Sequence, residues 1–331
     1  MTSTNIDRIK SLTDKLLLSD GSSVNSRSSD IVINKNNLGF SIDISGIDLD
    51  EAEKIRELTI SEIKKQEDFE KISIVLTSMR ASKKDEKPKL HIEGVKEIIV
   101  VAAGKGGVGK STVSALLAHK LKNEGKKVGI IDADIYGPSI PNIFNLSGKP
   151  ELENSKMLPL ENYGIHINSI GFLTDPSASV SWRGPMTSKA LYQLLSLTKW
   201  TDLDYLIIDT PPGTGDIHLS LLQNYIIDKV IMISTPQKIA EIDVTRAINL
   251  YKKFNIPIAG IIENMSYFVD PSSGQEIKIF AGNSSSKISK EHNIPILAKI
   301  AITPELSVAC DSGNDLKEFV SLLPFDINSH I

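Results

Sequence analysis

The stretch that decides the fold is Gly104-Lys105-Gly106-Gly107-Val108-Gly109-Lys110-Ser111-Thr112. It follows the apolar run Ile98–Ala103 and opens an amphipathic run, which is the strand, glycine loop and helix context of a phosphate-binding loop. Glycines let the backbone turn so that several N–H groups point at one anion, and the dipole of the following helix adds positive potential there. A glycine turn that binds nothing is the alternative, and the coincidence of the loop with its flanking elements disfavours it. We therefore predict that these residues bind the phosphates of a nucleotide.

Three side chains of this stretch carry specific chemistry. Lys110 can reach the terminal phosphates, and the hydroxyl of Ser111 can bind Mg²⁺. Lys105 adds a second lysine ahead of Lys110. A surplus surface lysine is the alternative for Lys105, but a lysine inside an anion cradle is well placed to stabilise charge that develops during phosphoryl transfer. We predict catalytic roles for Lys105 and Lys110, with Lys105 acting within one subunit or reaching across a dimer.

Composition places the chain among ordinary globular proteins. It has 331 residues, 40% hydrophobic and 24% charged, which is enough for a sizeable core and about two domains. The net charge of −4 gives no reason to expect a nucleic acid partner, and no apolar run approaches the roughly 20 residues of a membrane span. The single cysteine, Cys310, excludes an intrachain disulfide, and Met1–Leu18 lacks the apolar core of a secretory signal. We expect a cytoplasmic protein that binds neither nucleic acid nor membrane.

A charged, apolar-poor segment divides the chain. Arg80–Lys89 mixes lysines with two acidic residues and contains Pro88, which cannot donate a backbone hydrogen bond. A basic patch that binds a partner is the alternative, and the acidic residues favour a solvated linker. We predict a small α+β domain over residues 1–80, a linker over residues 81–95 and a P-loop ATPase domain over residues 96–331.

The first of these domains shows the periodicities of strands and of a helix. Apolar residues alternate over residues 38–44 and 72–76, as they do in half-buried strands. Ile31–Ile33 can pair with the first of these through a turn at residues 34–37. Asp48 is placed to cap a helix that runs to about Gln66.

The second domain contains short, continuous apolar runs, several of them separated by stretches of helical character. Strands that are covered on both faces have this pattern, so we predict an α/β fold with a mostly parallel sheet and helices on both faces. Ligands of such sheets bind at the carboxyl ends of the strands, where the phosphate loop also lies. The predicted strands are Ile98–Ala103, Val128–Ile131, Tyr205–Ile208, Val230–Ile233, Ile258–Ile262 and Ile296–Leu297.

Three acidic residues follow two of these strands. Asp132 and Asp134 come after the second strand, and Asp209 ends the third. A carboxylate there can hold Mg²⁺ directly or through water, and the Pro-Gly-rich loop after Asp209 can respond to a γ-phosphate. A turn or helix cap is the alternative for a single aspartate. Three at two strand ends favour metal binding and water positioning, so we place Asp132 and Asp209, with Ser111, on the Mg²⁺ side.

The loop with its extra lysine resembles the deviant Walker A motif of the MinD/ParA class of ATPases. Further motifs, in order along residues 96–313, resemble the Mrp/ApbC family of iron–sulfur cluster carrier ATPases. The segment before the linker resembles the small α+β domain that many of these proteins carry in front. The motifs are DADIYGPSIPNIF (Asp132–Phe144), SIGFL (Ser169–Leu173), WRGPM (Trp182–Met186), DYLIIDTPPGTGD (Asp204–Asp216), STPQ (Ser234–Gln237) and ENMSYF (Glu263–Phe268).

The resemblance implies a homodimer that hydrolyses ATP slowly with Mg²⁺ and serves iron–sulfur apoproteins or assembly factors. By it, Lys105 reaches the nucleotide of the partner subunit, and Asp134 orients the attacking water. Asp209 is the carboxylate on the Mg²⁺ side. Asn264 contacts the adenine, whose edge an asparagine amide can both donate to and accept from. The resemblance also implies a [4Fe–4S] cluster shared by two subunits.

The chain departs from this family where cluster ligands are expected. Members that hold a cluster continue after ENMSYF into Cys-x-x-Cys, whereas Asp270 and Ser273 stand at those two positions here. A [4Fe–4S] cluster takes four thiolates, and the only thiol of this chain is Cys310, in a helix-like stretch where we expect it to be buried. Aspartate is a hard oxygen ligand, and serine is not ionised near neutral pH, so neither replaces sulfur well. The residues therefore argue against a cluster bound in the manner of the family.

Two functions remain open for the ATPase. The first is a carrier or accessory factor in iron–sulfur protein maturation, and the second is a metal-free, nucleotide-switched adaptor whose output is protein binding. A membrane-associated partitioning ATPase ranks last because it needs an amphipathic C-terminal helix. Phe319–Ile331 is short, contains Pro324 and lacks a basic face.

Overall fold

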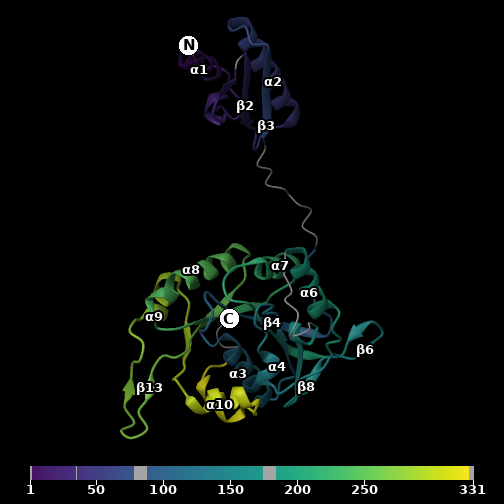
Figure 1. The fold of residues 1–331 in the computed structure, drawn as a ribbon, viewed down its shortest axis with the longest axis vertical. Coiled ribbons are helices and arrows are strands. Elements are labelled where there is room, and N and C mark those ends of the chain that lie inside the picture. The colour runs from purple at the N-terminus through teal and green to yellow at the C-terminus, as the bar shows by residue number, and fades with distance from the viewer. Residues whose placement is uncertain (1, 35, 78–87, 174–183, 328–331) are drawn as a thin grey trace. The chain divides into compact units, whose positions relative to one another are not determined.

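The computed structural model describes residues 2–34, 36–77, 88–173 and 184–327. It divides the chain into two compact units, Met1–Lys87 and Pro88–Ile331, which are described separately (Figure 1). Residues 81–87 of the predicted linker and the first two residues of the WRGPM motif lie outside the described residues.

The N-terminal unit is a three-stranded sheet with two helices. Strand β2 pairs antiparallel with β1 and parallel with β3, as Val32↔Gly39 and Leu38↔Ile72 show. The predicted strands and the long helix are present, whereas the first helix was not predicted. The elements are α1 (Thr2–Thr13), the 3-10 turn η1 (Asn25–Arg27), β1 (Val32–Asn34), β2 (Asn37–Asp43), α2 (Leu49–Gln66) and β3 (Lys71–Thr77).

Helix α2 begins where the sequence indicated. The Asp48 side chain accepts a hydrogen bond of 3.0 Å from the backbone N–H of Asp50, which satisfies one of the free donors at the helix start. Ala52, Thr59 and Ile63 are buried at helical spacing. This apolar face packs with the alternating residues of β2 and β3 into one core.

The second unit begins earlier than the predicted boundary at residue 96. Leu90 forms a β-bridge with Tyr225, Ile92 is buried, and β4 starts at Val95. These apolar side chains join the core of the second unit because burial removes them from water. Residues 88–95 thus belong to that unit.

The second unit is built on an eight-stranded sheet. Neighbouring strands are parallel except for the edge pair β8 and β9, which is antiparallel. All six predicted strands are present, and β8 and β9 were missed because their apolar residues alternate with polar ones. In spatial order the strands are β15 (Ile296–Lys299), β12 (Ile258–Glu263), β11 (Lys229–Ser234), β4 (Val95–Ala103), β10 (Leu203–Asp209), β5 (Val128–Asp132), β9 (Ile165–Ser169) and β8 (Leu160–Asn162).

Helices cover both faces of this sheet, as predicted (Figure 1). Side chains of β4 alternate between two cores, with Ile99 on one face and Ile98 on the other. The first face carries α3 (Lys110–Asn123), α4 (Ile140–Ile143), α10 (Pro304–Ser312) and the 3-10 helix η2 (Lys317–Leu322). The second carries α6 (Gly184–Ser196), α7 (Asp216–Asn224), α8 (Lys238–Lys253) and α9 (Ser284–His292). Shorter elements are α5 (Ile170–Leu173), β6 (Leu152–Glu153), β7 (Lys156–Met157), β13 (Phe268–Val269) and β14 (Glu276–Ile277).

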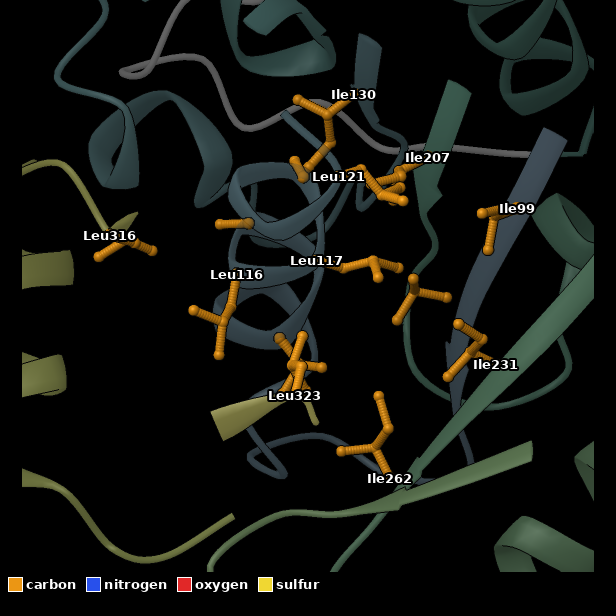
Figure 2. Close-up of a cluster of buried hydrophobic side chains, with 14 of the residues drawn as sticks. Ile99, Leu116, Leu117, Leu121, Ile130, Ile207, Ile231, Ile262, Leu316 and Leu323 are labelled. Atoms are coloured by element: carbon orange, nitrogen blue, oxygen red, sulfur yellow. The ribbon is translucent and has the colours of Figure 1, made fainter. Parts of the chain in front are cut away.

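Helix α3 is packed on two sides. Figure 2 shows Leu117 pointing toward the strands that carry Ile99 and Ile207. Leu116 points to the opposite side of the helix, where Leu316 lies. The helix that follows the glycine loop is therefore held between the sheet and the C-terminal segment.

Among the helices that the structure describes, none combines the length and apolar character needed to cross a membrane.

Leu117→Ala tests this packing. Leu117 is fully buried, so we expect the free energy of unfolding of the second unit to fall by about 3 kcal/mol, from lost transfer energy and the cavity left behind. Leu152→Ala is the control, because Leu152 is 71% exposed and should change stability by less than about 0.5 kcal/mol. Both tryptophans of the chain, Trp182 and Trp200, lie in this unit, so denaturant unfolding followed by tryptophan fluorescence reports on it. Equal midpoints for the two variants would contradict the assignment.

Candidate functional site

A cavity of about 700 Å³ opens at the carboxyl ends of the strands. Every residue from Lys105 to Thr112 lines it, as do Asp134 and Pro212. The remaining wall comes from the segment around α4 and from the end of α10, where Cys310 lies. The structure thus brings the predicted phosphate loop to the position that a parallel sheet offers for a ligand.

Glycines of the loop are required by its backbone and its neighbours. Gly107 and Gly109 have φ angles of +76° and +80°, which side-chain-bearing residues adopt at a cost. A Cβ on Gly104 would lie 2.3 Å from the backbone carbonyl carbon of Asp243, so the loop packs directly on α8. Helix α3 starts at Lys110, and its positive end therefore faces the cavity.

Lys110 is paired with two carboxylates at the bottom of the site. Its Nζ lies 2.8 Å from Oδ1 of Asp209 and 3.8 Å from Oδ2 of Asp134. Asp209 also accepts hydrogen bonds of 2.6 Å from Ser111 Oγ and 2.7 Å from Ser114 Oγ. A buried charge needs such partners, because its loss of hydration is otherwise uncompensated.

Asp132 and Asp134 occupy different places although they are two residues apart. Asp132 is fully buried and accepts hydrogen bonds from the backbone N–H groups of Asp134 and Ile140 and from Ser169 Oγ, each of 3.1 Å. Burial, and then the charge of Asp209, raise the pKa of Asp132 to about 8. Neither Asp132 nor Asp209 lines the cavity, whereas Asp134 does. Asp132 therefore holds the loop that carries Asp134.

Asp134 itself is shielded from solvent. Burial raises the pKa of its carboxyl group, and the nearby ammonium of Lys110 opposes this shift. Its Oδ1 accepts a hydrogen bond of 3.3 Å from the backbone N–H of Tyr136. A carboxylate in this position can accept a proton from, or orient, a water molecule in the cavity.

Lys105 reaches the start of α8. Its Nζ donates a hydrogen bond of 3.0 Å to Oε1 of Gln237, the residue that precedes α8. Thr235 Oγ1 donates to the same oxygen at 3.1 Å. In the single chain the extra lysine is thus held at the rim of the loop.

Asn264 lies beneath the loop. Its Nδ2 donates a hydrogen bond of 2.9 Å to the carbonyl of Val108, and it packs against Gly109. The structure therefore joins the end of β12 to the glycine loop through this side chain.

Asp270 and Ser273 lie at the tip of the hairpin formed by β13 and β14. Oδ1 of Asp270 accepts hydrogen bonds from the backbone N–H and the hydroxyl of Ser272, and Oδ2 accepts one of 2.8 Å from Ser273 Oγ. These bonds, led by the one from the Ser272 hydroxyl, lower the pKa of Asp270 to about 2. The two residues form a closed polar turn, as is usual for aspartate and serine.

Oxygen donors of this kind do not fit a [4Fe–4S] cluster, which takes thiolates. Cys310 is buried in α10, as predicted, and burial raises the pKa of its thiol. Within the described ranges, no group of three or more His, Cys, Asp or Glu side chains is arranged to hold a metal ion.

Two residues of the site were missed from the sequence. Ser114 follows Ser111 by three positions, so both hydroxyls lie on one face of α3, and this spacing is a signal that could have been used. Gln237 belongs to the STPQ motif, but its contact with Lys105 joins residues 132 positions apart and could not be predicted from the sequence.

Comparison with known proteins matches most of the chain to a family. The ParA family model described as "NUBPL iron-transfer P-loop NTPase" matches residues 94–322. An iron-sulfur cluster carrier protein of Rickettsia felis is 50% identical over 317 residues, which cover 95% of this chain and 96% of that protein. The iron-sulfur cluster transfer protein NUBPL of Mus musculus is 44% identical over 225 residues, which cover 67% of this chain and 70% of that protein.

A solved structure agrees with the fold. The nucleotide-binding protein of Archaeoglobus fulgidus in complex with ADP is 34% identical and superposes with a TM-score of 0.62. The match covers 72% of this chain and 95% of that chain.

Gly109→Ala tests the conformation of the loop. The left-handed backbone costs roughly 1–2 kcal/mol for alanine, and the new Cβ would lie 2.2 Å from Asn264 Nδ2. We therefore expect a loss of at least about 1 kcal/mol in denaturant unfolding. Gly106→Ala is the matched control, because its Cβ would meet only Pro212, at 3.8 Å. If both variants unfolded at the same denaturant concentration, the loop geometry would be wrong.

Proposed function

The chain belongs to the ParA family of NUBPL-type iron-transfer P-loop NTPases, and from this premise we propose that it is a Mg²⁺-dependent ATPase acting in iron–sulfur cluster assembly or transfer. One observation carries the ATPase part of the proposal. Lys110, Ser111 and Asp134 line one cavity together with the glycine loop, and the buried Asp209 carboxylate contacts Lys110 and Ser111. The ADP in the similar structure from Archaeoglobus fulgidus supports a nucleotide as the ligand of this cavity.

Phosphate binding is proposed for Gly104–Thr112. The backbone N–H groups of the loop and the start of α3 provide positive potential, and Lys110 provides a full charge. In the structure this charge is balanced by Asp209 and Asp134. Phosphate oxygens would take over that balance when a nucleotide binds. Asn264 remains the proposed contact for the adenine, and its amide lies next to the loop.

The residues beside Lys110 are suited to hydrolysis. Ser111 and Asp209 place a hydroxyl and a carboxylate 2.6 Å apart, and hard oxygen donors of this type fit Mg²⁺. When bound, Mg²⁺ supplies positive charge to the phosphate oxygens. Asp134 would orient the attacking water, and Lys110 and Lys105 would stabilise charge on the transferred phosphoryl group. The sequence places Asp132 on the Mg²⁺ side, but its two oxygens accept hydrogen bonds from the backbone N–H groups of Asp134 and Ile140, so we propose instead that it positions Asp134.

Two functions of the ATPase have support. The names of the relatives support work on iron–sulfur clusters for apoproteins or assembly factors. A metal-free, nucleotide-switched adaptor is the second candidate, and one observation favours it. The Asp270 carboxylate is satisfied by Ser272 and Ser273 in its own turn, with no thiol beside it.

The proposal also covers the oligomeric state and the cellular location of the protein. We propose a cytoplasmic homodimer with two nucleotides between its subunits, in which Lys105 leaves Gln237 to reach the nucleotide of the partner. Lys105 is half-buried at the rim of the cavity, from which a long side chain can extend.

Lys110→Ala and Asp134→Ala should separate binding from turnover. Lys110→Ala removes the main cation of the cradle, so we expect the Kd for Mg·ATP in calorimetry to rise by at least about 100-fold. Asp134→Ala should leave that Kd within about threefold of the original value and lower kcat by about 100-fold or more. Lys122→Ala, on the exposed side of α3, controls for loss of one lysine. Micromolar ATP affinity in Lys110→Ala, or unchanged turnover in Asp134→Ala, would contradict these roles.

Anaerobic reconstitution with iron and sulfide tests the output. The natural chain should take up little cluster at the hairpin, whereas Asp270→Cys with Ser273→Cys should take up more, because it supplies two thiolates per subunit. Visible absorbance and iron content measure the uptake. A colourless natural protein that dimerises with ATP supports the adaptor. Equal, stoichiometric uptake by both proteins would show that the cluster binds away from the hairpin.

A further inference from the structure

Two buried polar side chains lie behind the loop that follows Asp209. His218 of α7 and Tyr251 of α8 are both fully buried. The Nδ1 atom of His218 is 2.9 Å from the hydroxyl of Tyr251, and its Nε2 is 2.9 Å from the carbonyl oxygen of Pro211. The two rings meet edge to face, with centroids 6.1 Å apart. Polar groups this deep are costly unless they bind one another.

The direction of these hydrogen bonds follows from the partners. The Pro211 carbonyl can only accept, so Nε2 of His218 carries the proton and donates. In a neutral imidazole Nδ1 then accepts, and the Tyr251 hydroxyl donates to it. Burial lowers the pKa of His218 to about 4, which keeps the ring in this neutral form.

The Thr210–Gly213 loop has few backbone groups that can form hydrogen bonds. Pro211 and Pro212 have no backbone N–H groups, so their carbonyl oxygens are their only backbone hydrogen-bonding groups. On the other side, Thr210 Oγ1 donates to the carbonyl of Val101, and the Gly213 N–H donates to the carbonyl of Ala103, both at 2.8 Å. The loop is thus held to β4 at two points, to α7 through His218, and to α8 through the hydrogen bond between the Tyr251 and Thr210 side chains.

Helix α8 connects this anchor to the phosphate loop. Tyr251 lies in its last turn, while Asp243 nearer its start packs against Gly104. Gln237, just before the helix, binds Lys105. A shift of Pro211 therefore acts on the helix that also contacts the glycine loop.

We propose that His218, oriented by Tyr251, is a positioning residue that holds the Thr210–Gly213 loop against the γ-phosphate side of the cavity and couples the loop to α8. This inference rests on the proposed ATPase function. Pro212 lines the cavity, so the position of its backbone decides what the loop presents to a nucleotide. ADP lacks the γ-phosphate, and its binding should not depend on this anchor.

Three variants and one control separate positioning from general stability. His218→Leu removes both hydrogen bonds of the imidazole, and Tyr251→Phe removes the bond that orients the ring together with the contact of the Tyr251 hydroxyl with Thr210. His218→Gln can still donate to the Pro211 carbonyl and serves as the conservative rescue. Tyr225→Phe is the matched control, because Tyr225 is also buried and its hydroxyl meets Ser196 at the far end of α7, at 3.1 Å.

Steady-state ATP hydrolysis and calorimetric binding of Mg·ADP give the result. We expect His218→Leu to lower kcat about tenfold, Tyr251→Phe about threefold, and His218→Gln and Tyr225→Phe less than twofold. The Kd for ADP should stay within about twofold in all four. Hydrogen exchange of residues 210–217 should show ATP-dependent protection in the natural chain that is reduced in His218→Leu.

Other outcomes overturn the inference. One such outcome is a kcat equal to that of the natural chain in both His218→Leu and Tyr251→Phe. Another is a loss of ADP binding as large as the loss of turnover, in proportion to the fall in melting temperature and also present in Tyr225→Phe. If His218→Leu does not fold, Tyr251→Phe and His218→Gln decide. Failure of the natural chain to bind or hydrolyse ATP would instead overturn the proposed function, and this inference with it.

Discussion

The site depends on the buried ion pair between Lys110 at the start of α3 and Asp209 at the end of β10, whose charged atoms are 2.8 Å apart. Neither side chain has much access to water, so each needs the other. Ser111 and Ser114 add hydrogen bonds to the same carboxylate. The pair thus fixes the start of α3, where the glycine loop ends, against the end of β10. A phosphate that paired with Lys110 would leave the Asp209 carboxylate without this partner. Nucleotide binding would thereby affect the loop that follows Asp209.

The sheet register explains why two neighbouring acids have different roles. Asp132 and Asp209 are directly paired across β5 and β10. Two ionised carboxylates side by side in a buried sheet repel each other, which contributes to the raised pKa of Asp132. Asp209 is compensated by Lys110, and Asp132 by backbone N–H groups of the loop that leads to α4. Asp209 therefore pairs with the Lys110 ammonium, whereas Asp132 fixes the conformation of the loop that leads to α4.

The polar groups of the β13–β14 hairpin turn and those of the loop after Asp209 find their hydrogen-bond partners in two different ways. Asp270 is held by hydroxyl and backbone groups of its own turn, so the hairpin keeps its pairing without thiols. Pro211 lacks an N–H group, and its carbonyl is held from outside by His218. The first arrangement is self-contained, whereas the second makes the loop depend on α7 and α8. Movement caused by a nucleotide should therefore spread through the second arrangement.

The sequence by itself determined the strands around the glycine loop, the start of α2 at Asp48 and the phosphate-loop residues, because apolar runs, caps and positive-φ glycines act locally. It did not reveal β8 and β9, the start of the second unit before residue 96, or the separation of Asp132 from the cavity. It also missed Gln237 beside Lys105 and His218 beside Pro211. Only the tertiary structure decided these points, because they depend on which distant backbone groups and side chains meet when the sheet is assembled.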